Sequence, residues 1–147
     1  MTDILWFLVV FGISLATDWI SKKVVLQKMT VGQRKKVYSV FYLRPVYNQG
    51  LAFGSFKGKT KGIKIGTTIA ALLLTAIVFY HIYAYEAVLF SIAGGLLVGG
   101  AWGNLMERLS KGKVTDFLYV RFRSWPIFNL ADVFLTIGMI LFMVLLL

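Results

Sequence analysis

Residues 128–147, FNLADVFLTIGMILFMVLLL, contain a single charged side chain, that of Asp132. A run of this length and composition predicts a helix that crosses a lipid bilayer, which needs about 20 mostly apolar residues. A carboxylate at the start of such a helix is costly unless it is paired, hydrated or protonated, so it marks a functional site by default. The stretch therefore predicts a membrane fold and names Asp132 as the first residue to explain.

The composition of the whole chain also indicates a membrane protein. Of its 147 residues 59% are hydrophobic, and the mean hydropathy is +0.77. Soluble domains of this size have a lower apolar content. The length predicts one integral membrane domain over residues 1–147. The absence of cysteine excludes disulfides, a thiolate nucleophile and cysteine-bound metals.

Three other segments are long and apolar enough to cross a bilayer, so four transmembrane helices are expected at about 4–26, 63–83, 88–107 and 128–147. Residues 38–56 between the first two are rich in Val, Tyr and Phe and also contain Pro and Gly, which predicts short strands and turns. We therefore expect an all-α membrane protein with a small β-rich surface subdomain between helices 1 and 2.

Four spans in up-and-down order bring the polar residues to one membrane face. The residues expected to converge there are Asp18, Lys22, Asn48, Asn104, Arg108, Asp116, Asn129 and Asp132. All 16 Lys and Arg residues lie on or near the same face, and the net charge is +10. These basic residues flank apolar spans, so we expect them to contact anionic phospholipid headgroups and do not expect a nucleic-acid partner.

The chain has only six acidic residues, and two of them lie close together in the last part of the sequence. Asp116 stands in VTDFLYV, and Asp132 follows Asn129, which we expect to cap the fourth helix. Two neighbouring carboxylates share one proton, and the pair can polarise a carbonyl and activate water. This is the chemistry of an aspartic peptidase, which needs no metal, no cofactor and no nucleophilic side chain.

Other interpretations of these acids stay open at the level of spacing. Each aspartate could instead cap a helix or pair with an arginine, namely Arg108, Arg121 or Arg123. Asp18 and Lys22 stand four residues apart and predict a same-face ion pair, either as a neutralised helix anchor or facing a substrate. His81, the single histidine, is expected at the opposite end of the bundle, which argues against histidine-based catalysis or metal binding. The alternative function is a non-enzymatic membrane protein that binds or relays cations through its clustered aspartates.

Five short motifs occur in order along the chain: DWISK with Asp18 and Lys22; NQGLAF with Asn48, Gly50, Ala52 and Phe53; GNLMER with Gly103, Asn104 and Arg108; VTDF with Asp116; and FNLAD with Asn129, Ala131 and Asp132. Together they resemble the motifs of the lipoprotein signal peptidases, the type II signal peptidases of bacteria. The resemblance covers essentially the whole chain. Two residues depart from the family pattern, Glu107 where an aspartate is usual and Tyr47 where a basic residue is frequent.

The resemblance implies that Asp116 and Asp132 are catalytic and that the other motif residues bind substrate or shape the site. The implied substrate is a prolipoprotein carrying diacylglyceryl on its lipobox cysteine, which is cleaved just before that cysteine. Cyclic peptide antibiotics such as globomycin are the implied inhibitors. We expect a monomer in the bacterial cytoplasmic membrane.

The expected orientation rests on two arguments that disagree. The positive-inside rule places the basic face in the cytoplasm. The resemblance implies an active site at the outer face with both termini in the cytoplasm. We follow the resemblance, because lipobox cleavage takes place after export.

Overall fold

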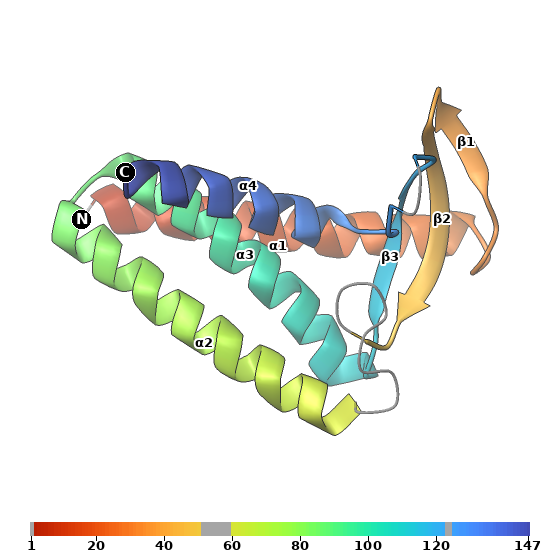
Figure 1. Cartoon of the computed structure of the whole chain (residues 1–147), viewed down its shortest axis with the longest axis horizontal. Coiled ribbons are helices and arrows are strands. Elements are labelled where there is room, and N and C mark those ends of the chain that lie inside the picture. Colours follow the sequence, from red (N-terminus) through yellow and green to blue (C-terminus); the bar gives the residue numbers. More distant parts are fainter. Residues whose placement is uncertain (1, 51–59, 123–124) are drawn as a thin grey trace.

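The computed structural model describes residues 2–50, 60–122 and 125–147. In chain order its elements are α1 (Thr2–Lys28), β1 (Lys35–Tyr38), β2 (Phe41–Asn48), α2 (Thr60–Tyr85), α3 (Val88–Lys111), β3 (Val114–Val120) and α4 (Leu130–Leu145). The helices form an elongated bundle, the sheet stands across one end of it, and both termini lie at the other end (Figure 1). The fold is thus mostly helical with one small sheet.

Three of the helices are long and apolar enough to cross a membrane, and they span Asp3–Lys28, Lys61–Tyr85 and Val88–Lys111. The fourth predicted span is shorter than expected, because α4 has 16 residues. At about 1.5 Å per residue it is shorter than the roughly 30 Å hydrocarbon core. It starts at Leu130 because the preceding residues are extended: Phe128 forms a β-bridge with Leu118, and Asn129 has φ −133° and ψ −178°.

Helix α3 lies at the centre of the bundle and packs against each of the other three helices. Its glycines permit this, because a Cβ atom at Gly95 or Gly99 would collide with side chains of α1, and one at Gly100 would collide with the backbone of α4. The four-residue spacing of Gly95, Gly99 and Gly103 predicts such a close helix contact. The structure confirms it, since all three face α1.

The sheet is antiparallel with the strand order β1-β2-β3. Strands β1 and β2 come from the connection between α1 and α2. Strand β2 lies within the segment 38–56 that was predicted to form strands, and β1 begins just before it. Strand β3 comes from the connection between α3 and α4 and was not predicted from the sequence. Its register places Asp116 beside Val46 and Val114 beside Asn48. The expected motif residues Ala52 and Phe53 lie outside the described residues.

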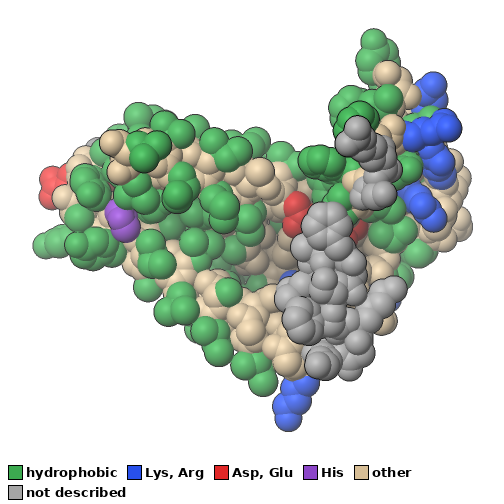
Figure 2. Space-filling model, viewed as in Figure 1, with side chains coloured by type: hydrophobic (Ala, Val, Ile, Leu, Met, Phe, Trp, Pro, Cys, Tyr) green, Lys and Arg blue, Asp and Glu red, His purple; other side chains and the backbone are tan. Residues whose placement is uncertain are grey.

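The surface divides into an apolar and a basic region. Hydrophobic side chains cover the visible face of the bundle, whereas Lys and Arg gather along the outer side of the sheet and the histidine lies near the far end (Figure 2). Exposed Leu, Ile and Val side chains on α1, α2 and α4 account for the apolar region. This surface fits a multi-pass membrane protein whose sheet lies at one side of the bilayer.

Candidate active site

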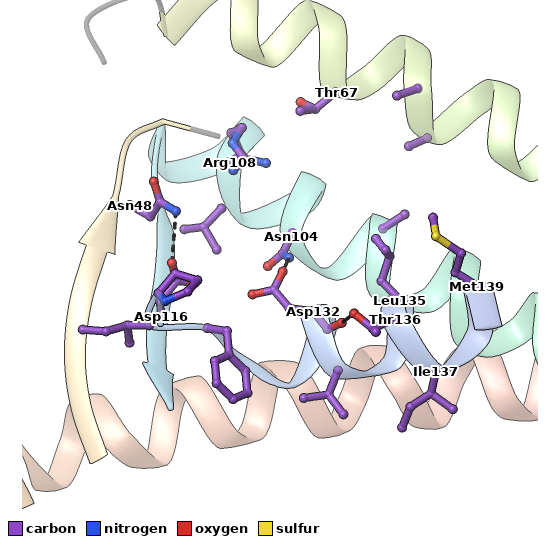
Figure 3. A pocket seen from close by; sticks show the side chains of 18 of the residues that line it. Asn48, Thr67, Asn104, Arg108, Asp116, Asp132, Leu135, Thr136, Ile137 and Met139 are labelled. Carbon is purple, nitrogen blue, oxygen red and sulfur yellow. Dashed lines mark hydrogen bonds between the residues drawn. The ribbon is translucent and has the colours of Figure 1, made fainter. Parts of the chain in front are cut away.

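Asp116 lies in the middle of β3 with its side chain turned toward the helices, and it is 4% exposed. Its Oδ2 atom accepts a hydrogen bond from the Asn48 amide at 3.1 Å, and its Oδ1 atom accepts one from the Asn129 amide at 2.7 Å. Two strands and the cap of helix α4 therefore hold this carboxylate, and Figure 3 shows the contact from Asn48.

Asp132 lies in the first turn of α4 and is half-buried. The Asn104 amide donates to its Oδ1 atom at 2.7 Å, and the backbone N–H of Asn129 donates to its Oδ2 atom at 3.1 Å. The Asn129 side chain in turn accepts from the backbone N–H of Asp132, which completes a capping box. A carboxylate is favoured at this position because the N-terminal end of a helix carries partial positive charge.

Asn129 therefore contacts both aspartates. Its side-chain amide donates to Asp116, and its backbone N–H donates to Asp132. Asn129 is fully buried, and its side-chain amide also donates to the side-chain oxygen of Asn104 at 2.9 Å. The predicted helix cap is confirmed, and one asparagine fixes how the two carboxylates lie relative to each other.

The environment of Asp116 favours its protonated form. Burial raises the pKa of this carboxyl to about 6, and the negative charge of Asp132 acts in the same direction. The hydrogen bonds from Asn48 and Asn129 oppose this shift. Asp116 can therefore keep a proton at pH values where an ordinary aspartic acid is ionised.

Asp18 and Lys22 form the predicted ion pair at 2.7 Å, and both are buried. Neither lines the cavity that contains Asp116 and Asp132. Lys22 also donates to the side-chain oxygen of Asn104 at 3.1 Å, and the Asp18 carboxylate accepts a hydrogen bond from the backbone N–H of Ala131 at 2.9 Å. Of the two alternatives, the structure favours a structural anchor over a substrate-facing pair, since the two residues hold Asn104 and the start of α4 from outside the cavity.

Glu107 and Thr115 are supporting residues whose contacts were not predicted from the sequence. The Glu107 carboxylate accepts the backbone N–H of Thr115 at 3.0 Å and its hydroxyl at 2.6 Å. The same carboxylate pairs with Lys22 and Lys111 at 3.2 Å each. Thr115 precedes Asp116, so Glu107 ties α1, α3 and β3 together beside a candidate catalytic residue. The GNLMER motif and the scarcity of acids in the sequence both pointed to Glu107.

Arg108 points to the cavity from α3 and donates to the Gly50 carbonyl at 3.2 Å (Figure 3). Within the described part of the chain, its buried Nε atom has no hydrogen-bond partner. The alternative pairing of the aspartates with arginine is not observed for Arg108 or Arg121 among the described residues. Arg123 lies outside them.

A cavity of about 1010 Å³ joins the two carboxylates to the membrane-facing helices. Its polar end contains Asp116 and Asp132. Further polar lining residues are Asn48, Asn104 and Arg108. Its apolar walls come from α2 and α4, with Ala70, Ala71, Leu74, Leu135 and Met139 among the lining residues. Helix α2 diverges from α4 toward the sheet, so the cavity lies between them (Figures 1 and 3). A groove with this arrangement can hold an apolar peptide segment along its walls and a peptide bond at its polar end.

Comparison with known proteins identifies the family. The family model described as Signal peptidase (SPase) II matches residues 10–147. The chain belongs to this family. It is 37% identical over 139 residues to a lipoprotein signal peptidase of Moorella thermoacetica, covering 92% of this chain and 88% of the relative. It is 34% identical over 139 residues to that of Microcystis aeruginosa, covering 92% and 87%.

A solved structure agrees with this assignment. A bacterial membrane enzyme determined by the in meso method at 2.3 Å resolution superposes with a TM-score of 0.83. The two chains are 26% identical, and the match covers 95% of this chain and 86% of the other. The resemblance inferred from the five motifs is thus confirmed for this signal peptidase II family member.

Proposed function

We propose that this chain is an aspartic endopeptidase that removes signal peptides from diacylglyceryl-modified prolipoproteins by cutting just before the lipidated cysteine. Family membership supports the peptidase activity and the substrate class. The observation that carries the catalytic type is the pair of carboxylates, Asp116 and Asp132, that share Asn129 as a hydrogen-bond donor at the end of an apolar groove.

In the proposed reaction the dyad holds one proton. Asp116, whose pKa is raised to about 6, donates a hydrogen bond to the scissile carbonyl oxygen, while the Asp132 carboxylate accepts a proton from a water molecule. The hydroxide oxygen bonds to the carbonyl carbon and gives a tetrahedral intermediate. The amide nitrogen then takes a proton from the dyad, the C–N bond breaks, and the products are the signal peptide carboxylate and the free amine of the cysteine. The proton count belongs to the pair, since coupled groups titrate as a unit.

The groove between α2 and α4 fits the proposed substrate. The apolar helix of a signal peptide would lie along the apolar walls, with the scissile bond at the polar end. Asn48 and Arg108 line the cavity and would orient the backbone or the glyceryl ester, whereas the fully buried Asn129 would act through the two carboxylates that it holds. Globomycin-type cyclic peptides would occupy the same groove. Ala52 and Phe53 are proposed as substrate contacts on the motif resemblance alone.

We propose that the protein crosses the bacterial cytoplasmic membrane four times, as a monomer, with its site at the outer face and its termini in the cytoplasm. Both termini lie at the same end of the bundle, opposite the sheet, and this supports an even number of membrane crossings (Figure 1). Helix α4 would then cross a locally thinned bilayer, or rely on its flanking residues to make up the length.

The experiment is mass spectrometry of prolipoprotein incubated with the purified protein. The proposal predicts two products whose masses place the cut immediately before the lipidated cysteine. A precursor with serine in place of that cysteine cannot be lipidated and should remain intact. A cut at another bond, or equal cleavage of both precursors, would contradict the proposed specificity.

A further inference from the structure

A second groove of about 820 Å³ lies between α1 and α3. None of its lining residues also lines the active-site cavity. Its floor is formed by buried groups that support the active site, namely Asp18, Lys22 and Glu107. The proposed reaction leaves this groove without a role. Its volume is within the roughly 300–1,000 Å³ typical of ligand sites.

The lining of this groove changes from apolar to polar along the helices. Leu15, Ala16 and Trp19 line it on the part of α1 that is nearer the middle of the bundle. Its other end, in the last two turns of α1 and the last turn of α3, is lined by Lys23, Gln27, Ser110 and Lys111. A phospholipid at a bilayer surface has the same arrangement, with acyl chains toward the middle and a polar headgroup outside.

The charges of the groove leave one cation without a counterion. Three lysines line it, Lys22, Lys23 and Lys111, against the two carboxylates of Asp18 and Glu107. Lys22 and Lys111 pair with these carboxylates, whereas Lys23 has no carboxylate partner among the described residues. Its ammonium group lies 4.9 Å from the centre of the Trp19 ring, and the residue as a whole is exposed. This excess of positive charge at the polar end favours an anionic headgroup.

We propose that the α1–α3 groove binds one anionic phospholipid, with its phosphate at Lys23 and Lys111 and an acyl chain against Leu15, Ala16 and Trp19. The bound lipid would cover the floor residues Lys22 and Glu107. Because Lys22 donates to Asn104 and Glu107 accepts from Thr115, the lipid would stabilise the side of the bundle that supports the dyad. Binding to the folded state alone raises its stability by mass action.

The test is native mass spectrometry of the full chain in detergent with equimolar phosphatidylglycerol and phosphatidylcholine of identical acyl chains. The unchanged protein should retain one phosphatidylglycerol about tenfold or more over phosphatidylcholine, since each lysine near a membrane surface contributes to anionic lipid binding. The double variant Lys23→Gln/Lys111→Gln should lose this preference. The single variant Lys23→Gln should reduce this preference and breaks no ion pair among the described residues, so it serves if the double variant is unstable.

Two further variants separate a shaped site from general attraction to basic side chains. Lys28→Gln/Lys35→Gln removes two exposed lysines outside the groove and should keep the preference. Ala16→Phe fills the apolar part without changing charge and should reduce retention of phosphatidylglycerol about tenfold or more. Soluble glycerol phosphate should not displace the lipid. Equal retention of the two lipids by the unchanged protein, or unchanged retention in Lys23→Gln and Ala16→Phe, would overturn the proposal.

Discussion

The side chain of Asn129 holds Asp116 while its backbone holds Asp132, so the geometry of the dyad depends on this residue. Asn129→Ser keeps a side chain that caps helices well but removes the amide donor to Asp116. We expect thermal stability within a few degrees of the unchanged protein and a fall in kcat of about 100-fold, because small misplacements of catalytic groups have effects of that size. Calorimetry and cleavage kinetics on the same preparation measure both. Unchanged kcat would show that Asn129 is only a helix cap.

The raised pKa of Asp116 predicts how activity depends on pH. Asp116 must hold a proton to polarise the scissile carbonyl, so kcat/KM should fall as the pH rises through about 6 in the free enzyme. The Asn48 hydrogen bond lowers this pKa, so Asn48→Ala should move the fall to higher pH. A pH profile of kcat/KM for both proteins is the measurement. A shift to lower pH in the variant would contradict the assignment of the proton to Asp116.

The raised pKa of Asp116 also determines whether the folded protein becomes more or less stable as the pH rises. The folded-state pKa is raised above the ordinary value of 3.8, so between these values the folded protein binds the additional proton. The stabilisation that protonated Asp116 contributes is complete below about pH 4 and is lost as the pH rises through about 6. Ionised Asp116 is therefore a cost that the fold carries at neutral pH, as expected for a functional carboxylate.

At the scale of elements, Glu107 connects β3 to the helix bundle through Thr115. Glu107→Gln should lower the free energy of unfolding by about 1–3 kcal/mol, because it removes the charge that faces buried Lys22 and one acceptor for Thr115. Glu107→Asp restores the residue usual in the family and should keep kcat/KM within about tenfold of the unchanged protein. Denaturation in detergent and cleavage kinetics distinguish the two variants. A larger loss in Glu107→Asp than in Glu107→Gln would show that length matters more than charge here.

The helices were predictable because apolar runs of this length have few alternatives in a bilayer, and the predicted ranges differ from the observed ones mainly at their ends. Strand β3 was not predicted, although VTDFLYV is rich in β-branched and aromatic residues, because its partner β2 is far away in sequence. The cap at Asn129 was predictable from local chemistry. Its amide contact with Asp116 was not, since it requires the sheet to meet the start of α4. The contact between Glu107 and Thr115 joins residues only eight positions apart, but the chain turns from α3 into β3 between them, so their spacing did not indicate it.

At the scale of the molecule, we propose that a membrane-embedded substrate reaches the dyad through the opening between α2 and α4. Ala70 is exposed and lines this cavity, so Ala70→Phe should narrow it and leave the fold intact. We expect KM for a lipidated prolipoprotein to rise about tenfold with little change in kcat, since the variant affects binding in the ground and transition states alike.

The matched control is Ala76→Phe, which adds the same side chain to an exposed position of α2 outside the cavity. This variant should leave KM unchanged. An equal rise in KM for both variants would mean that bulk on α2 perturbs the bundle and that the substrate does not enter between α2 and α4.

The proposed mechanism requires Asp116 and Asp132 to act as one unit, and cleavage by their asparagine variants tests this directly. Asp116→Asn and Asp132→Asn should each abolish cleavage of a lipidated prolipoprotein, and the double variant should be no worse than either single one, because residues of one catalytic unit are not additive. All three should fold and insert, and Asp3→Asn at the far end of α1 should retain full activity. Substantial turnover by either folded single variant would contradict the aspartic mechanism and favour a cation-binding role for the two carboxylates.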